Sequence, residues 1–390
     1  MKQFNHSKPI QFTSERKLEA SRLTELMKTK RPFSFLRLGD LELIFMVTCQ
    51  NENKYNVEWF DEKKTVSSNI VYGHPGLDVS HYPRLIHAYE NCSFLDFHDG
   101  WKVNIEHLPK LKLNRHQEAL RNSSPQTSQI FFDWLEYEFS GYIKGHRVLL
   151  AGGEAGILAE LYKDREYHEA FKGFWPENAE VYFLGETRRH KTHLDVIKAD
   201  LKKFILEHKI DTLFLSMGGG AKIVCYELAV ELGICTFDFG GLMRALTYSG
   251  SDGYAFYRAV HNPFLFRVPL SSYMKAVKAS YPGITPAQLL AKAHAQLALE
   301  LQTKEKGWSY AAEIYGEDCF NPEGENWSAF QESYTYYKRE IFPLTTNDPE
   351  AKKQAREFQH WLWERGIGWQ SPFYKVYRCL RGGIKKILSR

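Results

Sequence analysis

Three successive apolar segments of the chain end in glycines and are separated by helical patterns. They cover residues 181–184, 212–217 and 234–237, and residues 33–38 and 147–151 end in the same way. Strand, glycine turn and helix in this order are typical of a parallel, doubly wound sheet, whose ligands bind beyond the carboxyl ends of the strands. We therefore predict an α/β fold with a Rossmann-like parallel sheet flanked by helices, from about residue 30 to residue 245.

The sequence pattern changes after about residue 245. Residues 285–306 and 349–365 carry long helical patterns, and an aromatic-rich connection at 308–342 joins them. A length of 390 residues suits two domains of about 100–200 residues each. We predict an α/β catalytic domain over residues 1–245 and a mostly helical extension over residues 246–390, in which most of the aromatic side chains form the core.

Charge and cysteine content exclude several classes of protein. The chain has 51 Lys and Arg against 47 Asp and Glu, a formal net charge of only +4, so we expect no nucleic-acid partner. Its six cysteines form no C-x-x-C pair, which excludes the usual zinc and disulfide patterns. We find neither a secretion signal nor an apolar stretch of membrane-spanning length, and we expect a cytoplasmic protein.

The C-terminal residues 372–390 are basic and amphipathic. They contain six Lys and Arg residues and no acidic residue. Such a segment suits contact with an anionic membrane surface, here the inner face of the membrane. The alternative is a terminal helix that packs on the protein.

Two carboxylates, Asp40 and Glu42, flank Leu41 directly after the predicted strand at 33–38. We place them on a loop, where both can turn toward one point and hold a hard cation such as Mn²⁺ or Mg²⁺, which would neutralise a diphosphate. Arg37 could pair with them or reach a phosphate. The alternative is that both are ordinary surface carboxylates, or that Asp40 caps the next helix.

Glycine turns at residues 152–156 and 218–220 would present backbone N–H groups at helix N-termini, which suits a phosphate or a ribose. Neither turn is a G-x-G-x-x-G fingerprint or a P-loop, so a dehydrogenase and an ATPase are disfavoured. The glycines could equally serve to let helices pack on strands. Glu154, within the first turn, is a candidate catalytic or sugar-contacting carboxylate, or a helix N-terminal residue without substrate contact.

Four basic residues, Arg188, Arg189, His190 and Lys191, follow the predicted strand at 181–184. Cations at the start of a helix oppose its dipole, which points to an anionic ligand such as a pyrophosphate. A solvated helix start is the alternative. Asp238, after the predicted strand at 234–237, could hydrogen-bond sugar or ribose hydroxyls, or cap the following turn.

Two ordered motifs resemble the GT-D-type glycosyltransferases, a bacterial family with a Rossmann-like fold. F-S-F-L-R-L-G-D-L-E at residues 33–42 is similar to the family's R-x-G-D-G-E segment, whose D-x-E supplies the metal and nucleotide-sugar site. L-S-M-G-G-G-A-K-I-V-C-Y-E-L at 215–228, followed by D-F-G at 238–240, resembles the closing pattern of G-P-T-A, Y-E-L and D-I-G. This sequence departs at Leu41, at Gly219-Gly220 in place of Pro-Thr, and at Gly241, where the family often has His.

The resemblance implies a metal-dependent glycosyltransferase that uses a nucleoside-diphosphate donor, expected to be a UDP-sugar. The implied acceptor is a glycan, glycoprotein or lipid-linked molecule in bacterial surface-polysaccharide synthesis. Asp40 and Glu42 would hold Mn²⁺ or Mg²⁺ and, with Glu154, form the catalytic set. The expected substrate-binding residues are Arg37, Gly39, Gly153, Arg188, His190, Lys191, Gly218, Gly219 and Asp238.

Two other functions stay open. Residues 148–156 loosely resemble the strand and glycine turn of an S-adenosylmethionine-dependent methyltransferase, and a nucleotide-binding module without catalysis would carry similar turns.

Overall fold

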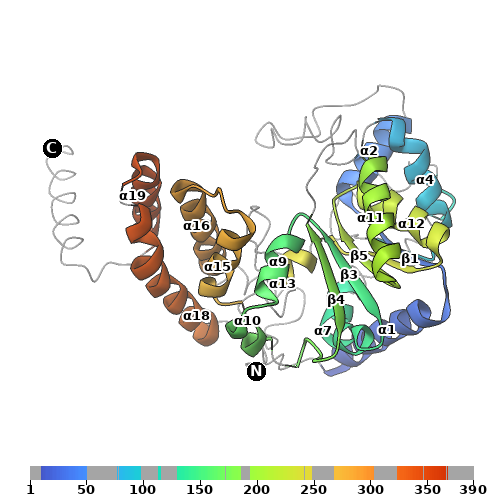
Figure 1. The fold of residues 1–390 in the computed structure, drawn as a ribbon, viewed down its shortest axis with the longest axis horizontal. Coiled ribbons are helices and arrows are strands. Elements are labelled where there is room, and N and C mark those ends of the chain that lie inside the picture. Colours follow the sequence, from blue (N-terminus) through green and yellow to red (C-terminus); the bar gives the residue numbers. More distant parts are fainter. Residues whose placement is uncertain are drawn as a thin grey trace, which may run out of the picture.

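The computed structural model describes residues 10–50, 77, 79–97, 113–115, 130–171, 173–185, 194–240, 242–247, 268–302, 323–345, 347–365 and 367. Two bodies are visible in Figure 1, an α/β unit and a group of long helices beside it. The predicted basic residues 188–191 and the basic segment 372–390 lie outside the described residues.

Six parallel strands in the described residues form one sheet, as the sequence predicted. They are β1 (Phe33–Leu38), β2 (Phe94–Phe97), β3 (Arg147–Gly152), β4 (Glu180–Gly185), β5 (Thr212–Ser216) and β6 (Cys235–Asp238). Their order is β2-β1-β6-β5-β3-β4, and every neighbouring pair is parallel. The last strand in the sequence, β6, therefore lies between β1 and β5 in the middle of the sheet.

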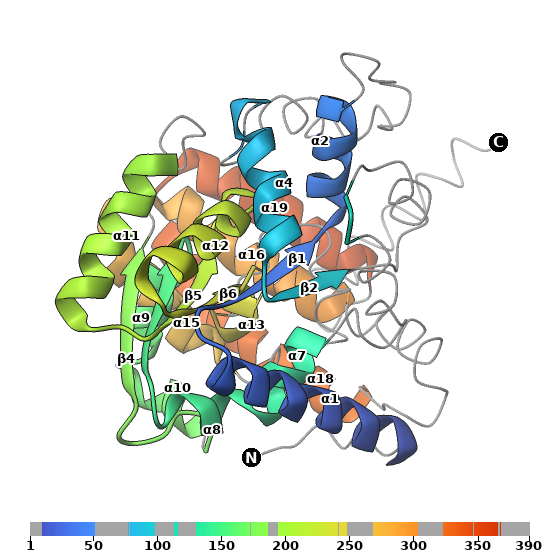
Figure 2. The same cartoon turned by 90° about the vertical axis from the view of Figure 1, so that its right-hand side faces the viewer.

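Helices cover both faces of the sheet, as expected for strands that are buried on both sides (Figures 1 and 2). One face is covered by α2 (Asp40–Gln50), α4 (Tyr82–Asn91), α11 (Leu194–His208) and α12 (Gly220–Leu232). The other face is covered by α1 (Ile10–Thr29), α7 (Ile130–Tyr137), α8 (Phe139–Ile143), α9 (Ala155–Leu161), α10 (Arg165–Ala170) and α13 (Leu242–Thr247). Successive strand side chains alternate between the two apolar clusters, so each face has its own core.

Aromatic side chains fill the core on the α7 side. The Trp134 and Phe237 rings stack with centroids 5.1 Å apart, and Phe35 stacks on Phe237 at 4.1 Å. The Trp134 indole N–H donates to the Thr24 hydroxyl at 2.9 Å, which satisfies its polar atom inside the core. The packing fixes β6 beside β1, and with it the side chains at the carboxyl ends of both strands.

The C-terminal region is helical, as predicted. It contains α15 (Leu270–Ser280), α16 (Pro286–Gln302), α18 (Glu323–Tyr336) and α19 (Pro349–Glu364), with a π-helical turn at Tyr337–Ile341 and a 3₁₀ turn at Phe342–Thr345 between the last two. Part of the predicted aromatic connection is thus helical. No helix in the described residues is long and apolar enough to span a membrane.

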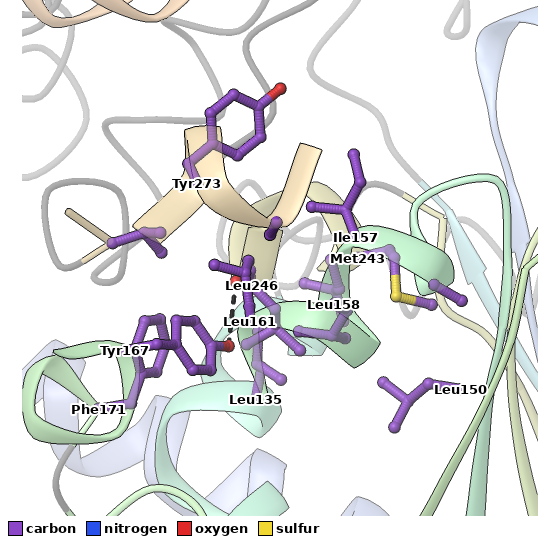
Figure 3. Close-up of a cluster of buried hydrophobic side chains, with 14 of the residues drawn as sticks. Leu135, Leu150, Ile157, Leu158, Leu161, Tyr167, Phe171, Met243, Leu246 and Tyr273 are labelled. Carbon is purple, nitrogen blue, oxygen red and sulfur yellow. Dashed lines mark hydrogen bonds between the residues drawn. The ribbon is translucent and has the colours of Figure 1, made fainter. Parts of the chain in front are cut away.

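The C-terminal helices pack against the α/β unit through α9 and α13 (Figure 3). Tyr273 of α15 belongs to the same apolar cluster as Ile157 of α9 and Met243 of α13. The Tyr167 hydroxyl donates to the Leu246 carbonyl at 3.1 Å, and the Ser272 hydroxyl donates to Asp164 Oδ1 at 2.8 Å. One core therefore runs across residue 246, and the division into units 1–245 and 246–390 stays a prediction.

Candidate functional site

A cluster of charged side chains lies at the carboxyl ends of β1 and β6. These two strands are neighbours, with Phe35 opposite Phe237, so Arg37 near the end of β1 lies close to Asp238 at the end of β6. Lys222 and Glu42 join the cluster from the first turns of α12 and α2, the helices that follow β5 and β1. This edge is where doubly wound sheets bind their ligands.

Arg37 is held from several sides. Its Nε lies 3.3 Å from Asp238 Oδ2, and its guanidinium lies 4.5 Å from the centre of the Phe131 ring. The Tyr89 hydroxyl donates to the Arg37 backbone carbonyl at 3.0 Å. Asp96 of β2 stands opposite Arg37 in the β1–β2 register, and its charge acts on the guanidinium. These contacts fix the direction of Arg37, whose side chain is still 22% exposed.

Lys222 bridges two carboxylates. Its Nζ lies 2.9 Å from Glu42 Oε1 and 3.2 Å from Asp238 Oδ2, and it donates to the Gly218 carbonyl at 3.4 Å. The three charged side chains are only 6%, 7% and 1% exposed for Lys222, Glu42 and Asp238. The Lys222 ammonium therefore links α12 to α2 and to β6 through ion pairs that are shielded from water.

The charges of the cluster stabilise each other. Burial alone would lower the pKa of Lys222, but Asp238 and Glu42 raise it above its ordinary value. The pKa of Arg37 is likewise raised, because Asp238, Asp96 and Glu42 outweigh the effect of burial. Both residues stay cationic, since an opposite charge nearby favours the charged form. With Asp96 included, the cluster has two cations, Arg37 and Lys222, and three carboxylates, which are Glu42, Asp96 and Asp238. When all five are ionised, its formal charge is −1.

Two glycines leave room for this cluster. Gly240, after β6, has a φ of +43°, and a Cβ built on it would overlap the guanidinium of Arg37. At Gly39, a Cβ would lie 2.6 Å from Glu42 Oε2. Glycine is required at Gly240 for both its left-handed backbone and the close approach of Arg37. The space above both glycines is thus used by charged side chains of the chain itself.

The parallel sheet with flanking helices agrees with the Rossmann-like fold that the two motifs imply. Residues 17–246, more than half of the chain, match the family described as GT-D fold-like domain. The chain belongs to the GT-D-like family. Searches of curated proteins and of solved structures gave no significant match.

The GT-D-like domain gathers some of the predicted site residues and leaves others apart. Arg37, Gly39, Glu42 and Asp238 lie in or beside the cluster. Gly218 has a φ of +69° and, with Gly219, forms the turn into α12, whose Gly218 carbonyl accepts from Lys222. Arg188, His190 and Lys191 lie outside the described residues.

Gly153 and Glu154 lie at the carboxyl end of β3. Glu154 is the residue before α9 and makes no capping hydrogen bond to that helix. In the strand order β6-β5-β3, this end is two strands from Asp238, roughly 10 Å at a strand spacing of about 4.8 Å. Glu154 therefore belongs to the same edge of the sheet but not to the charged cluster.

The placement of the D-x-E segment on a loop is wrong. Helix α2 begins at Asp40, so Asp40 and Glu42 are both in its first turn. Residues two apart in a helix do not face each other, and the inward direction of Glu42 does not set that of Asp40. The side chain of Asp40 lies outside the described part of the structure.

Sequence reasoning missed Lys222 and Asp96. Lys222 is a cation in the first turn of a helix, the same unfavourable position that drew attention to residues 188–191, and that signal could have identified it. Asp96 is a carboxylate inside the short apolar segment Phe94–Phe97. A charged residue within a buried strand is rare unless it is paired, but this segment is too short to be recognised as a strand from the sequence.

A divalent metal is compatible with the donors at this edge. Within the described residues, no group of three His, Cys, Asp or Glu side chains could form a complete metal cage. Mg²⁺ and similar ions are instead commonly held by one or two carboxylates together with substrate phosphates. Glu42 Oε1 is engaged by Lys222, and Asp40 is two positions away in the first turn of the same helix. The two carboxylates of this segment suit a metal that binds together with a diphosphate.

Proposed function

We propose that this GT-D-like protein is a glycosyltransferase that moves a sugar from a nucleoside-diphosphate donor, with a UDP-sugar as the expected donor. The proposed acceptor is a glycan, a glycoprotein or a lipid-linked molecule in bacterial surface-polysaccharide synthesis. The observation that supports this most is the buried cluster of Arg37, Asp238, Lys222 and Glu42 at the ligand-binding edge of a GT-D-like sheet.

In this proposal the diphosphate binds beside the first turns of α2 and α12. Arg37 provides a fixed, partly exposed guanidinium, a group whose geometry suits phosphate oxygens. The turn at Gly218 and Gly219 leads into α12, whose N-terminal N–H groups favour an anion. Arg188, His190 and Lys191 are proposed as further diphosphate contacts.

Asp40 and Glu42 would hold Mn²⁺ or Mg²⁺. When bound, the metal would supply positive charge that stabilises the leaving nucleoside diphosphate. The contribution of the chain itself is to hold Glu42 and Arg37 in fixed directions before the donor arrives. Such preorganisation lowers the barrier because the polar groups need not rearrange during the reaction.

Asp238 and Glu154 take different roles in the proposal. Asp238 is engaged by both Arg37 and Lys222 and is almost fully buried, which favours a positioning role over direct contact with a sugar hydroxyl. Glu154 lies farther along the same edge, on the turn after β3. We propose that it contacts the sugar or takes a proton from the acceptor hydroxyl.

The test is thermal stability with nucleotides, followed by donor turnover. Wild type is measured with UDP, GDP, CDP, dTDP and S-adenosylmethionine, each with and without Mn²⁺. We expect stabilisation by UDP that requires Mn²⁺, because ligands stabilise the folded state that binds them. We also expect slow release of UDP from UDP-sugars, which measures turnover of the donor.

Two variants test whether the Mn²⁺-dependent stabilisation depends on the D-x-E segment. Asp40→Asn should remove the Mn²⁺-dependent part, whereas Asp195→Asn, on the exposed start of α11, should leave it intact. Stabilisation by S-adenosylmethionine without metal would instead support a methyltransferase, and binding of UDP without turnover of any UDP-sugar would support a binding module.

A further inference from the structure

Lys222 occupies a position in which a cation is bound by two carboxylates from separate elements. Glu42 comes from α2 and Asp238 from β6, and both lie within 3.2 Å of the ammonium. The Gly218 carbonyl at 3.4 Å adds a third oxygen. These three oxygens match the three N–H donors of the ammonium, and carboxylate and carbonyl oxygens are also the ligands that a hard metal ion takes.

The same oxygens cannot serve the ammonium and a divalent metal at once. A metal bound to Glu42 Oε1 and Asp238 Oδ2 would lie about 2.0–2.6 Å from each oxygen, in the space that the Lys222 Nζ fills. Two cations so close together would also repel strongly, because the charged side chains here are shielded from water. Binding of one therefore excludes the other.

The position of Lys222 in its helix is electrostatically unfavourable. It lies in the first turn of α12, where the helix dipole disfavours a cation. Shorter or neutral side chains would avoid that cost. The two carboxylates compensate for it, which makes the ammonium an integral part of the cluster.

We propose that the Lys222 ammonium is a built-in cation that fills the position between Glu42 and Asp238 and keeps a divalent metal out of it. Lys222 is then a positioning residue: it directs Glu42 Oε1 toward the interior, so that no metal binds between the two carboxylates before a diphosphate arrives. The inference rests on the proposed function only in taking the D-x-E segment as the metal-binding segment. It implies weak metal binding in the absence of nucleotide.

The test measures binding of Mn²⁺ alone by electron paramagnetic resonance, with no nucleotide or sugar present. Lys222→Met removes the charge at similar length and should tighten Mn²⁺ binding at least tenfold. Lys222→Arg keeps the charge and should bind as weakly as wild type. The double variant Lys222→Met/Asp238→Asn should lose the gain. Unchanged or weaker Mn²⁺ binding in folded Lys222→Met would overturn the proposal.

Lys198 provides a matched control, because it pairs with carboxylates nearer the C-terminal end of α12. Lys198 of α11 also bridges two carboxylates, Glu227 and Glu231 of α12, but this network is more exposed, and Arg84 and Lys202 also pair with these carboxylates. Lys198→Met should therefore leave Mn²⁺ binding within twofold of wild type. A gain equal to that of Lys222→Met would mean that any released carboxylate pair attracts the metal, and would also overturn the proposal.

A measurement on wild type keeps the test valid if Lys222→Met does not fold. The ¹⁵N resonance of the Lys222 ammonium, assigned by its loss in Lys222→Arg, should keep its position when Mg²⁺ is added alone. A shift that follows Mg²⁺ binding would show displacement of the lysine and overturn the proposal. Failure of the proposed function would appear elsewhere, as the absence of UDP-dependent stabilisation and donor turnover in wild type.

Discussion

Helix α12 carries two ion networks that differ in their exposure to water. At its first turn, Lys222 joins Glu42, Asp238 and Arg37 in a buried cluster. Farther along, Glu227 and Glu231 pair with Arg84 of α4 and with Lys198 and Lys202 of α11 in a partly exposed network, called the surface network below. In the surface network each carboxylate has two cations and nearby water, so a lost partner is replaced. In the buried cluster a lost partner leaves an uncompensated charge.

The two networks have different roles: the surface network joins helices, whereas the buried cluster fixes the directions of side chains. Single exposed ion pairs contribute little to folding stability, and pairs linked in a network contribute more. Buried pairs fix directions and tolerate little change, and here they fix the side chains at the ligand-binding edge. The predictions below test whether the two networks differ in this way.

The largest effect is expected from Asp238→Ala, which removes the carboxylate shared by Arg37 and Lys222. Breaking a buried ion pair on one side costs about 3–5 kcal/mol, because the remaining charges stay buried. Urea unfolding measures the loss. Asp195→Ala removes a carboxylate that is 77% exposed and pairs with Arg84, and it should change stability little. Equal losses in the two variants would remove the distinction between the networks.

Gly240→Ala should have the next largest effect. The new Cβ needs a left-handed backbone and the space of the Arg37 guanidinium, so we expect a loss of about 2–4 kcal/mol. Gly233→Ala, at the C-terminal end of α12, is the control, because its φ is +68° but nothing lies within 4 Å of the new Cβ. Its loss should be about 1–2 kcal/mol, from the backbone alone. The difference, measured by denaturant unfolding, reports the displacement of Arg37.

Lys198→Met probes the surface network directly. Arg84 and Lys202 still neutralise Glu227 and Glu231 in this variant, so we expect a loss of about 0.2–1 kcal/mol. High salt should reduce the loss further, because it screens exposed charges. Unfolding at low and at 1 M NaCl, with roughly a 3 Å screening length at the latter, measures this dependence. A loss above about 3 kcal/mol would place Lys198 with the buried class.

The smallest effect is the pH dependence of the surface network. Burial alone would raise the pKa of Glu227, but hydrogen bonds from Arg84 and Lys198 lower it below 4.5. A carboxylate with a lowered pKa in the folded state contributes stability above its unfolded pKa and loses it as the pH falls through the folded value. The stability difference between wild type and Glu227→Gln, of the order of 0.5 kcal/mol at pH 7, should therefore shrink below pH 4.5. A difference that grows on acidification would have the wrong sign.

Local patterns predicted the sheet well. The strand at 33–38 was placed correctly because a run of apolar residues ends at Gly39, and the predicted glycine after α12 is Gly233, with a left-handed backbone. The short strand β2 was missed because four residues with Asp96 among them give no clear alternation.

The cluster could be predicted only in part, because its partners are distant in the sequence. Arg37 and Asp238 were both candidates, yet their contact depends on β6 entering the sheet beside β1. Lys222 and Glu42 are 180 positions apart, and no local pattern reports that they meet. Similarly, a D-x-E sequence is compatible with a loop and with the start of a helix, and the structure has the helix.

The central position of β6 has a consequence for how the protein forms during synthesis. Strands β1 and β5 cannot be bridged until residues 235–238 have left the ribosome, because β6 is the strand between them. Pairings between such distant segments form slowly, since a long loop must close first. The nascent chain thus carries Glu42 without its counter-charge on Lys222, and Arg37 without its counter-charge on Asp238, until nearly 240 residues exist. Completion of the sheet and assembly of the charged cluster are then a single folding event.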